Sequence, residues 1–280
     1  MNRIALFTVF YPGAEVYVDD FFESIKHQTR TDFDLVIVND GYKDTGLQDL
    51  YPWISIIELE GTNKISSNRA LGINYVIDKK YEYLILCDVD DFFSPFRIEK
   101  SIVYLDDSDI VVNDLNIVDS SRKVFFERYF SKSIDENVSL TSEFIQDKNI
   151  FGFSNTALRV SKIHKVIFPE DIRIVDWYYF TILLNEGLNA KFIPEALTDY
   201  RQHTGNMIGI TTCTVDMFKN LLQLKIQHYS YFTSKPTYKT LLDEMLNIES
   251  MSDVEKTVLL RNNEKRNLYP LWFQNVTIYK

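Results

Sequence analysis

The chain has 280 residues, and its 30 Lys and Arg against 40 Asp and Glu give a formal net charge of −10. With 45% hydrophobic residues it has enough apolar surface for a sizeable core, which excludes a largely disordered chain. The acidic excess argues against the basic footprint of a nucleic-acid-binding protein, so we expect no nucleic-acid partner. Cys87 and Cys213 are too few for a disulfide framework or a cysteine metal site.

Strand-like and helix-like patterns alternate through the first hundred residues. Apolar runs of strand length occupy residues 3–10, 33–38, 54–59 and 83–87, and helical spacing occupies residues 15–28 and 64–79. Strands that are apolar on both faces and separated by helices predict a parallel sheet with helices on both sides. Ligands bind such sheets outside the carboxyl ends of the strands, where this chain carries Asp40 and the acidic residues 88–91.

The pattern changes in the second half of the chain. Residues 109–120 and 123–131 predict two strands joined by a short turn, and residues 175–184 predict a helix that ends at Gly187. Phe151-Gly152-Phe153 predicts an aromatic loop. From residue 213 to about residue 267 the spacing is helical throughout, which indicates a helical extension.

The chain's start and end bear on where it resides. Its first residues run directly into a strand pattern, and no apolar run approaches the ~20 residues of a membrane helix, so we expect a soluble protein of the cytoplasm. Near the end, Arg and Lys at 261–266 precede Leu271, Trp272 and Phe273. A patch for peripheral contact with the inner face of a membrane is one interpretation. Packing of these apolar residues onto the rest of the chain is the one that we favour.

The Asp88-Val89-Asp90-Asp91 motif is the sharpest candidate for chemistry. It follows an apolar run, so a buried strand would deliver three carboxylates to one loop. Carboxylate oxygens suit Mg²⁺ and Mn²⁺, whereas a solvated loop or a helix cap is the plain alternative. Two kinds of enzyme use such a loop: a phosphatase of the haloacid-dehalogenase type, with Asp88 as nucleophile, and a nucleotide-sugar glycosyltransferase.

Six short blocks, in the expected order over residues 3–210, resemble family 2 glycosyltransferases of the GT-A fold, in particular the branch that includes bacterial rhamnosyltransferases. They are Phe7-Thr8-Val9-Phe10-Tyr11-Pro12, Gln28-Thr29 with Asp34-Leu35-Val36-Ile37-Val38-Asn39-Asp40-Gly41, Asn68-Arg69-Ala70-Leu71-Gly72, Leu86-Cys87-Asp88-Val89-Asp90-Asp91, Val175-Asp176-Trp177 and Tyr200-Arg201-Gln202-His203-Thr204-Gly205-Asn206. The chain departs from the family pattern at Tyr11, Asn39, Ala70 and Val175, which puts the identity of the donor in question.

The resemblance implies an α/β fold, GT-A and Rossmann-like, with a mostly parallel sheet flanked by helices. Residues 1–210 would form the catalytic domain, with a nucleotide-binding half at 1–105 and an acceptor half at 106–210. Residues 211–280 would form the helical C-terminal extension.

The resemblance also implies a set of site residues. The nucleotide-sugar donor would be bound by Phe10, Asn39, Asp40, Arg69, Asp88 and Arg201. A Mn²⁺ or Mg²⁺ ion would be held by Asp88, Asp90 and His203. Asp176 would be the general base that takes the proton of the acceptor hydroxyl, as an inverting transfer requires.

Each of these residues also has a plainer interpretation. Asp40 before Gly41 is a common turn residue, Arg69 suits a solvated helix face, and Asp176 suits the positive end of a helix dipole. Trp177 is expected in the core, and Asp91 is expected to support the loop or touch the acceptor.

The resemblance implies an inverting, metal-dependent transfer from a UDP- or dTDP-sugar to a glycan or lipid-linked glycan, in the synthesis of a bacterial surface polysaccharide. Two alternatives stay open. One is the phosphatase, and the other is a degenerate transferase domain that acts as a partner subunit.

Overall fold

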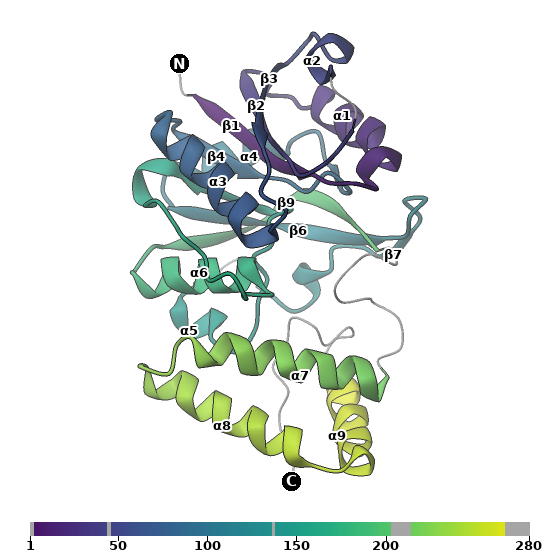
Figure 1. Cartoon of the computed structure of the whole chain (residues 1–280), viewed down its shortest axis with the longest axis vertical. Helices are drawn as coiled ribbons and strands as arrows, with labels where there is room; N and C mark the ends of the chain where they lie inside the picture. The colour runs from purple at the N-terminus through teal and green to yellow at the C-terminus, as the bar shows by residue number, and fades with distance from the viewer. Residues whose placement is uncertain (1–2, 44–45, 136–137, 203–213, 267–280) are drawn as a thin grey trace.

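The computed structural model describes residues 3–43, 46–135, 138–202 and 214–266. Figure 1 shows a twisted sheet with helices on its faces in the upper part of the molecule, and the carboxyl-terminal helices beneath it. Across the described residues the strand order is β3-β2-β1-β4-β8-β6-β9-β5, with β7 paired to β6.

The amino-terminal half of the sheet is parallel. Its strands are β1 (Ile4–Phe10), β2 (Phe33–Asn39), β3 (Ser55–Glu60) and β4 (Tyr83–Leu86). Each lies within two residues of its predicted range, because their apolar runs are nearly continuous and end at turn-forming residues. Their carboxyl ends consequently lie along one edge, as the sequence predicted.

The other half of the sheet is mixed. β8 (Thr156–Arg159) runs antiparallel to both β4 and β6, and β6 (Ile110–Val118) runs parallel to β9 (Ala190–Arg201). β6 also forms the predicted hairpin with β7 (Val124–Phe126), and the short β5 (Phe92–Phe93) pairs with β9.

β8 and β9 were not predicted from the sequence. β9 contains Pro194, which has no amide hydrogen to donate, and the pairing register with β6 skips from Ile193 to Leu197. Because of the proline and this irregularity, the twelve-residue strand lacks the simple alternation of apolar and polar residues that identifies a strand in a sequence.

Helices cover both faces of the sheet. α3 (Ile65–Asp78) and α6 (Val175–Asn185) share one apolar core with Ala5 and Phe7 of β1, whereas α1 (Val18–Lys26) and α4 (Arg97–Leu105) share the opposite core with Ile4 and Leu6. The remaining short helices are η1 (Ala14–Val16), α2 (Leu47–Leu50), η2 (Phe130–Lys132), α5 (Ser142–Ile145) and η3 (Val160–Lys162).

Gly72 explains why α3 lies so close to the sheet. A Cβ atom built at this position would lie 2.0 Å from the ring of Phe7 on β1. Only glycine permits this approach, and it brings Arg69, one turn earlier, close to the carboxyl end of β4.

The predicted helical extension consists of α7 (Val215–Ser230), α8 (Pro236–Ser250) and α9 (Asp253–Arg266). Its apolar residues belong to the same core cluster as α6, so the extension is joined to the sheet domain through α6. The predicted boundary at residue 211 and the apolar residues 271–273 lie outside the described residues.

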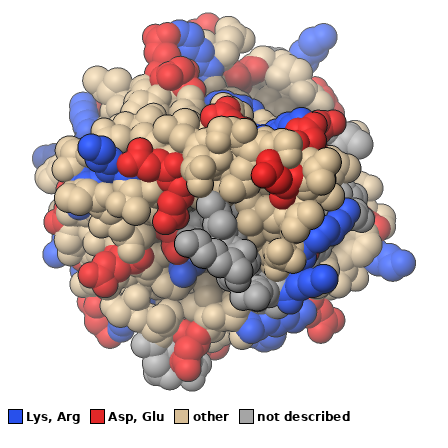
Figure 2. Space-filling view, turned by 90° about the horizontal axis from the view of Figure 1, so that it is seen from below, with Lys and Arg blue, Asp and Glu red and all other residues tan. Residues whose placement is uncertain are grey.

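The extension's outer face carries charges of both signs. Figure 2, viewed from that side, shows Lys and Arg interspersed with Asp and Glu. Within the described ranges, no helix has the length and apolar character needed to cross a membrane.

A buried polar cluster joins α7 to α6. The ring of His228 stacks on Trp177 with 3.8 Å between ring centroids, and the Nζ of Lys225 lies 4.9 Å from the centre of the same indole. His228 is 1% exposed, and neither of its ring nitrogens has a hydrogen-bond partner among the described residues. Burial, reinforced by the positive charge of Lys225, lowers the pKa of His228 well below its usual 6.5.

The neutral His228 predicts a specific pH dependence of stability. Because the folded state resists protonation while the unfolded state binds a proton near pH 6.5, this residue costs about 1.4 kcal/mol of stability per pH unit below that value. His228→Phe keeps an aromatic ring in the stack and removes the cost. We expect the melting temperature of the variant to exceed that of the wild type increasingly as the pH is lowered from 7.5 to 5.

The matched control is His27→Phe, because His27 has a 61% exposed side chain. Thermal unfolding at a series of pH values makes the measurement. A difference between His228→Phe and wild type that stays constant with pH would contradict a neutral His228.

Candidate functional site

The loop after β4 brings three carboxylates to the carboxyl edge of the sheet. Asp91 is the most enclosed, at 1% exposure, and it accepts hydrogen bonds from the hydroxyl of Ser154 and from the backbone N–H of Arg201, the latter at 2.7 Å. Burial raises the pKa of Asp91 well above its usual range, and the charges of Asp90 and Asp88 raise it further. Asp91 therefore fastens the loop to the loop before β8 and to β9.

A buried arginine lies behind this loop. Arg97 at the start of α4 is 2% exposed and donates hydrogen bonds to the carbonyl oxygen of Leu86 and, at 3.0 Å, to the side-chain oxygen of Asn113. Burial lowers the pKa of Arg97 to about 10, which leaves it charged at neutral pH. Its positive charge helps to balance the carboxylates that follow Leu86.

Asp88 is held by Arg69 of α3. The Nη2 of Arg69 donates to Asp88 at 2.5 Å, and the guanidinium lies 4.5 Å from the centre of the Phe153 ring. Burial raises the pKa of Asp88 and the ion pair with Arg69 opposes that rise. The Nη1 of Arg69 is buried without a hydrogen-bond partner in the described part of the chain.

Arg69, Asp88 and Asp176 line a single cavity of about 210 Å³. Arg69 and Asp176 are more than a hundred positions apart in the sequence. The three residues come from α3, the loop after β4 and the start of α6. The rest of the lining is largely apolar and comes from Ile65, Asn149, Phe153, Arg173, Ile174, Val175, Trp177 and Tyr200. A neighbouring cavity also includes Asp88, Asp176 and Tyr200, together with the aromatic loop at 151–153.

Asp176 lies in the first turn of α6, where its carboxylate accepts a hydrogen bond from the backbone N–H of Trp177 at 2.7 Å. Burial raises the pKa of Asp176 to about 6, against the effect of that hydrogen bond. A carboxylate with this pKa is ionised at neutral pH and is a stronger base than an ordinary aspartate. The helix-dipole interpretation and the catalytic interpretation are both compatible with this position.

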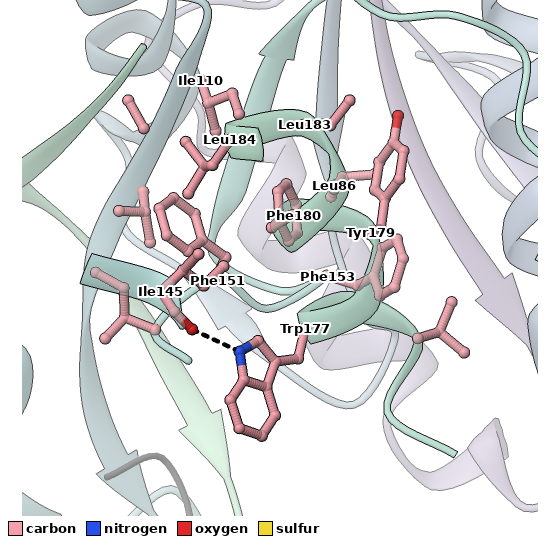
Figure 3. Close-up of a cluster of buried hydrophobic side chains, with 14 of the residues drawn as sticks. Leu86, Ile110, Ile145, Phe151, Phe153, Trp177, Tyr179, Phe180, Leu183 and Leu184 are labelled. Atoms are coloured by element: carbon pink, nitrogen blue, oxygen red, sulfur yellow. Dashed lines mark hydrogen bonds between the residues drawn. The ribbon is translucent and has the colours of Figure 1, made fainter. Parts of the chain in front are cut away.

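A rigid aromatic core supports the wall of the cavity. Figure 3 shows Trp177 donating from its indole nitrogen to the carbonyl oxygen of Ile145, at 2.8 Å, with Phe151 and Phe153 near Phe180 of α6. The rings of Phe151 and Phe180 stack with 5.2 Å between centroids. Trp177 is 3% exposed, which confirms its predicted place in the core.

A second hollow, of about 420 Å³, lies at the carboxyl ends of β2 and β3 and includes Asn39, Asp40 and Gly61. The Asp40 carboxylate accepts a hydrogen bond from the backbone N–H of Asn63 at 2.7 Å, and Asn39 accepts one from Gly41 at 3.2 Å. These bonds fix the loop while each carboxylate or amide oxygen retains acceptor capacity.

Two of the predicted donor-binding residues have buried side chains, and one predicted metal ligand lies outside the described residues. The side chain of Phe10 is fully buried among Phe21, Phe22 and Tyr42, so it offers no open surface to a donor. Its carbonyl oxygen accepts a hydrogen bond from the backbone N–H of Asp40. The side chain of Arg201 is 2% exposed and donates to Asp20 of α1 at 2.6 Å, whereas its backbone N–H holds Asp91 of the acidic loop. His203 lies outside the described residues.

The remaining acids suit a divalent cation. The predicted metal ligands were Asp88, Asp90 and His203. In the described ranges, no group of three or more His, Cys, Asp and Glu is arranged to hold a metal ion. Asp88 and Asp90 supply hard oxygen donors, and the hydroxyl of Tyr11 donates to Asp90 at 3.3 Å. The charge of Asp90 also raises the pKa of Asp88, an unfavourable interaction that a cation would relieve. The chemistry of the donor set therefore fits Mg²⁺ or Mn²⁺.

Sequence reasoning did not single out two residues of the cavity wall. Tyr200, at the end of β9, lines both cavities, and its pKa is raised by burial and by the surrounding carboxylates. Arg173 precedes α6 and lines the larger cavity. Tyr200 falls within a recognised block, but Arg173 carries no pattern that would have identified it.

A family model and several known proteins are similar to this chain in sequence. Residues 7–167 match the family described as glycosyl transferase family 2. An uncharacterized glycosyltransferase of Haemophilus influenzae is 26% identical over 80% of this chain and 72% of its own length. The O-antigen biosynthesis glycosyltransferase WbnJ of Escherichia coli is 26% identical over 67% of this chain and 75% of its own.

Solved structures share the fold at low sequence identity. The mannosyltransferase PcManGT from Pyrobaculum calidifontis, in complex with GDP-Man and Mn²⁺, superimposes with a TM-score of 0.60 at 13% identity, covering 95% of this chain and 76% of that one. S. aureus TarS 1-349 in complex with UDP-GlcNAc gives a TM-score of 0.56 at 14% identity, covering 94% and 71%. These neighbours are GT-A glycosyltransferases, which confirms the predicted fold class.

The family match covers more than half of the chain and confirms the resemblance to family 2 glycosyltransferases. The resemblance to the rhamnosyltransferase branch stays a prediction. The chain belongs to glycosyl transferase family 2.

Proposed function

We propose that this protein is an inverting, metal-dependent glycosyltransferase that transfers a sugar from a UDP- or dTDP-sugar to a hydroxyl group of a glycan or lipid-linked glycan. The observation that supports this most directly is the convergence of Arg69, Asp88 and Asp176 on one cavity. The haloacid-dehalogenase alternative is not retained, because the chain belongs to a different family.

In the proposed reaction, Asp176 acts on the acceptor. Its carboxylate takes the proton of the acceptor hydroxyl while that oxygen forms a bond to the anomeric carbon of the donor sugar. The bond between the anomeric carbon and the diphosphate oxygen breaks, and its electron pair leaves with the diphosphate. Attack opposite the leaving group inverts the configuration at that carbon.

The donor would reach from the hollow at Asn39 and Asp40 to the cavity lined by Arg69, Asp88 and Asp176. Asp40 would accept a hydrogen bond from the imide N–H of the base, and the positive charge of Arg69, which lines the cavity, would face the diphosphate. Asp88 and Asp90 would hold a divalent cation, which supplies charge neutralisation for the leaving diphosphate. Tyr200 and Phe153 would help to exclude water from the cavity between donor and acceptor.

The biological setting follows from relatives. WbnJ is described as an enzyme of O-antigen biosynthesis, and a teichoic acid poly(glycerol phosphate) polymerase of Staphylococcus epidermidis is 24% identical over 75% of this chain and 27% of its own length. Both names refer to polymers of the bacterial surface. We therefore propose that the acceptor of this protein is a surface polysaccharide or its precursor.

Asp176→Asn should abolish transfer and leave donor binding intact, because the amide cannot accept the acceptor's proton but retains the size of the side chain. We expect a loss of about 10²–10⁴-fold in kcat. Transfer assays and calorimetric titration with the nucleotide diphosphate make the measurement. A wild-type rate of transfer by this variant would contradict the role of Asp176 as the base. If neither the wild type nor the variant transfers sugar in the assay while Asp176→Asn keeps its function in cells, the alternative of a non-catalytic partner subunit is favoured.

The raised pKa of Asp176 predicts the acidic limit of activity. Only the ionised carboxylate accepts a proton, so kcat/KM should fall below about pH 6 and approach a tenfold decrease per pH unit. A pH–rate profile between pH 4.5 and 8 checks this. A limb centred near pH 4, where an ordinary aspartate titrates, would contradict the assignment.

Donor binding should require a divalent cation. Without one, the carboxylates of Asp88 and Asp90 repel a diphosphate; with Mn²⁺ they attract it through the ion. We expect UDP or dTDP to raise the melting temperature in the presence of Mn²⁺ and to have no effect with EDTA. GDP belongs in the same panel, because guanine also carries a ring N–H donor. Equal binding with and without EDTA would contradict metal dependence.

A further inference from the structure

Asp176 lies between two points at which the chain is attached to α7. Gln227 and His228 are neighbours on that helix. Gln227 binds the backbone before Asp176, and His228 stacks on Trp177 directly after it. Both belong to the extension, beyond the residues that match the family.

The first attachment is made by one side-chain amide. The Oε1 of Gln227 accepts from the backbone N–H of Arg173 at 3.1 Å, and its Nε2 donates to the carbonyl oxygen of Asp171 at 2.7 Å. The same stretch is held by Tyr231, whose hydroxyl donates to the Asp171 carboxylate at 2.6 Å, and by Asn220, which accepts from the Arg173 guanidinium at 2.9 Å. Three residues of α7 and its carboxyl end thus hold the stretch that leads into α6.

This stretch depends on such contacts because it has no regular structure of its own. Residues 164–174 belong to no helix or strand, so side chains must satisfy backbone groups that a sheet or helix would otherwise pair. The cavity wall begins in the same stretch, at Arg173, and continues through Asp176 to Trp177. The position of the wall is therefore set partly by α7.

We propose that Gln227 is a positioning residue for Asp176, acting through the backbone of residues 171–173; this rests on the proposed role of Asp176 as the base. The extension then serves the transfer step directly, by fixing the carboxylate relative to the anomeric carbon. A displacement of about 1 Å at a reacting group costs up to 10²-fold in rate.

Gln227→Met tests this, because methionine has a similar length and makes neither hydrogen bond. We expect kcat to fall between about ten- and a hundredfold, with the KM for the donor within about twofold of wild type. The matched control is Gln223→Met, one turn earlier on α7. The amide of Gln223 donates to Glu249 of α8 instead of to the segment before α6. The kcat of Gln223→Met should therefore be unchanged.

Gln227→Glu separates the two hydrogen bonds. An ionised glutamate still accepts from the N–H of Arg173 but cannot donate to the carbonyl oxygen of Asp171. We expect partial rescue, with a kcat between those of Gln227→Met and wild type. Melting temperatures and donor affinities of all three variants should stay near wild type.

Two results would overturn the inference. The first is a wild-type kcat for Gln227→Met. The second is a fall in its kcat that is accompanied by an equal loss of donor affinity and by a lower melting temperature, because that combination indicates a general structural role. Asp176→Asn is assayed in parallel. If Asp176→Asn is fully active, the proposed role of Asp176 as the base fails, and the positioning role with it; if it is inactive while Gln227→Met is normal, only the positioning role fails.

Discussion

The structure depends on keeping several carboxylates together at the end of one buried strand. Asp88, Asp90 and Asp91 follow β4 within five positions. Burial and the charges of neighbouring carboxylates raise the pKa values of Asp88 and Asp91. The protein offsets this with Arg97 behind the loop, Arg69 in front of it, and donors from Ser154 and Arg201 on Asp91. Each of these partners comes from a different element, so the acidic loop ties α3, α4, the loop before β8 and β9 to the same point.

The mixed half of the sheet supplies two of these partners. Ser154 lies just before β8 and Arg201 ends β9, and both donate to Asp91. The bulge at Pro194 lets β9 continue past an irregular pairing and still reach the loop at Arg201. The strands that were hardest to recognise in the sequence are thus the ones that complete the candidate site.

The extension contributes to the site through contacts that differ in kind from those of the sheet. The sheet positions carboxylates by backbone geometry at strand ends. α7 instead acts through side chains, with Gln227 on the backbone of residues 171–173 and His228 against Trp177. Burying His228 and Lys225 without full hydrogen bonding is costly. That cost is tolerated where the polar cluster joins α7 to the helix that carries Asp176.

The sequence by itself determined the parallel half of the sheet, the helices that cover it, the hairpin and the helical extension, because periodicity and turn residues are local properties. It also identified the acidic loop, Asp40, Arg69 and Asp176 through short blocks in a recognisable order. Only the tertiary structure decided that Phe10 is a core residue, that Arg201 braces the loop from a buried position, and that Arg173 and Tyr200 line the cavity. It also placed Gln227 on the segment before Asp176. These features depend on contacts between residues tens to hundreds of positions apart, and such contacts leave no local pattern in the sequence.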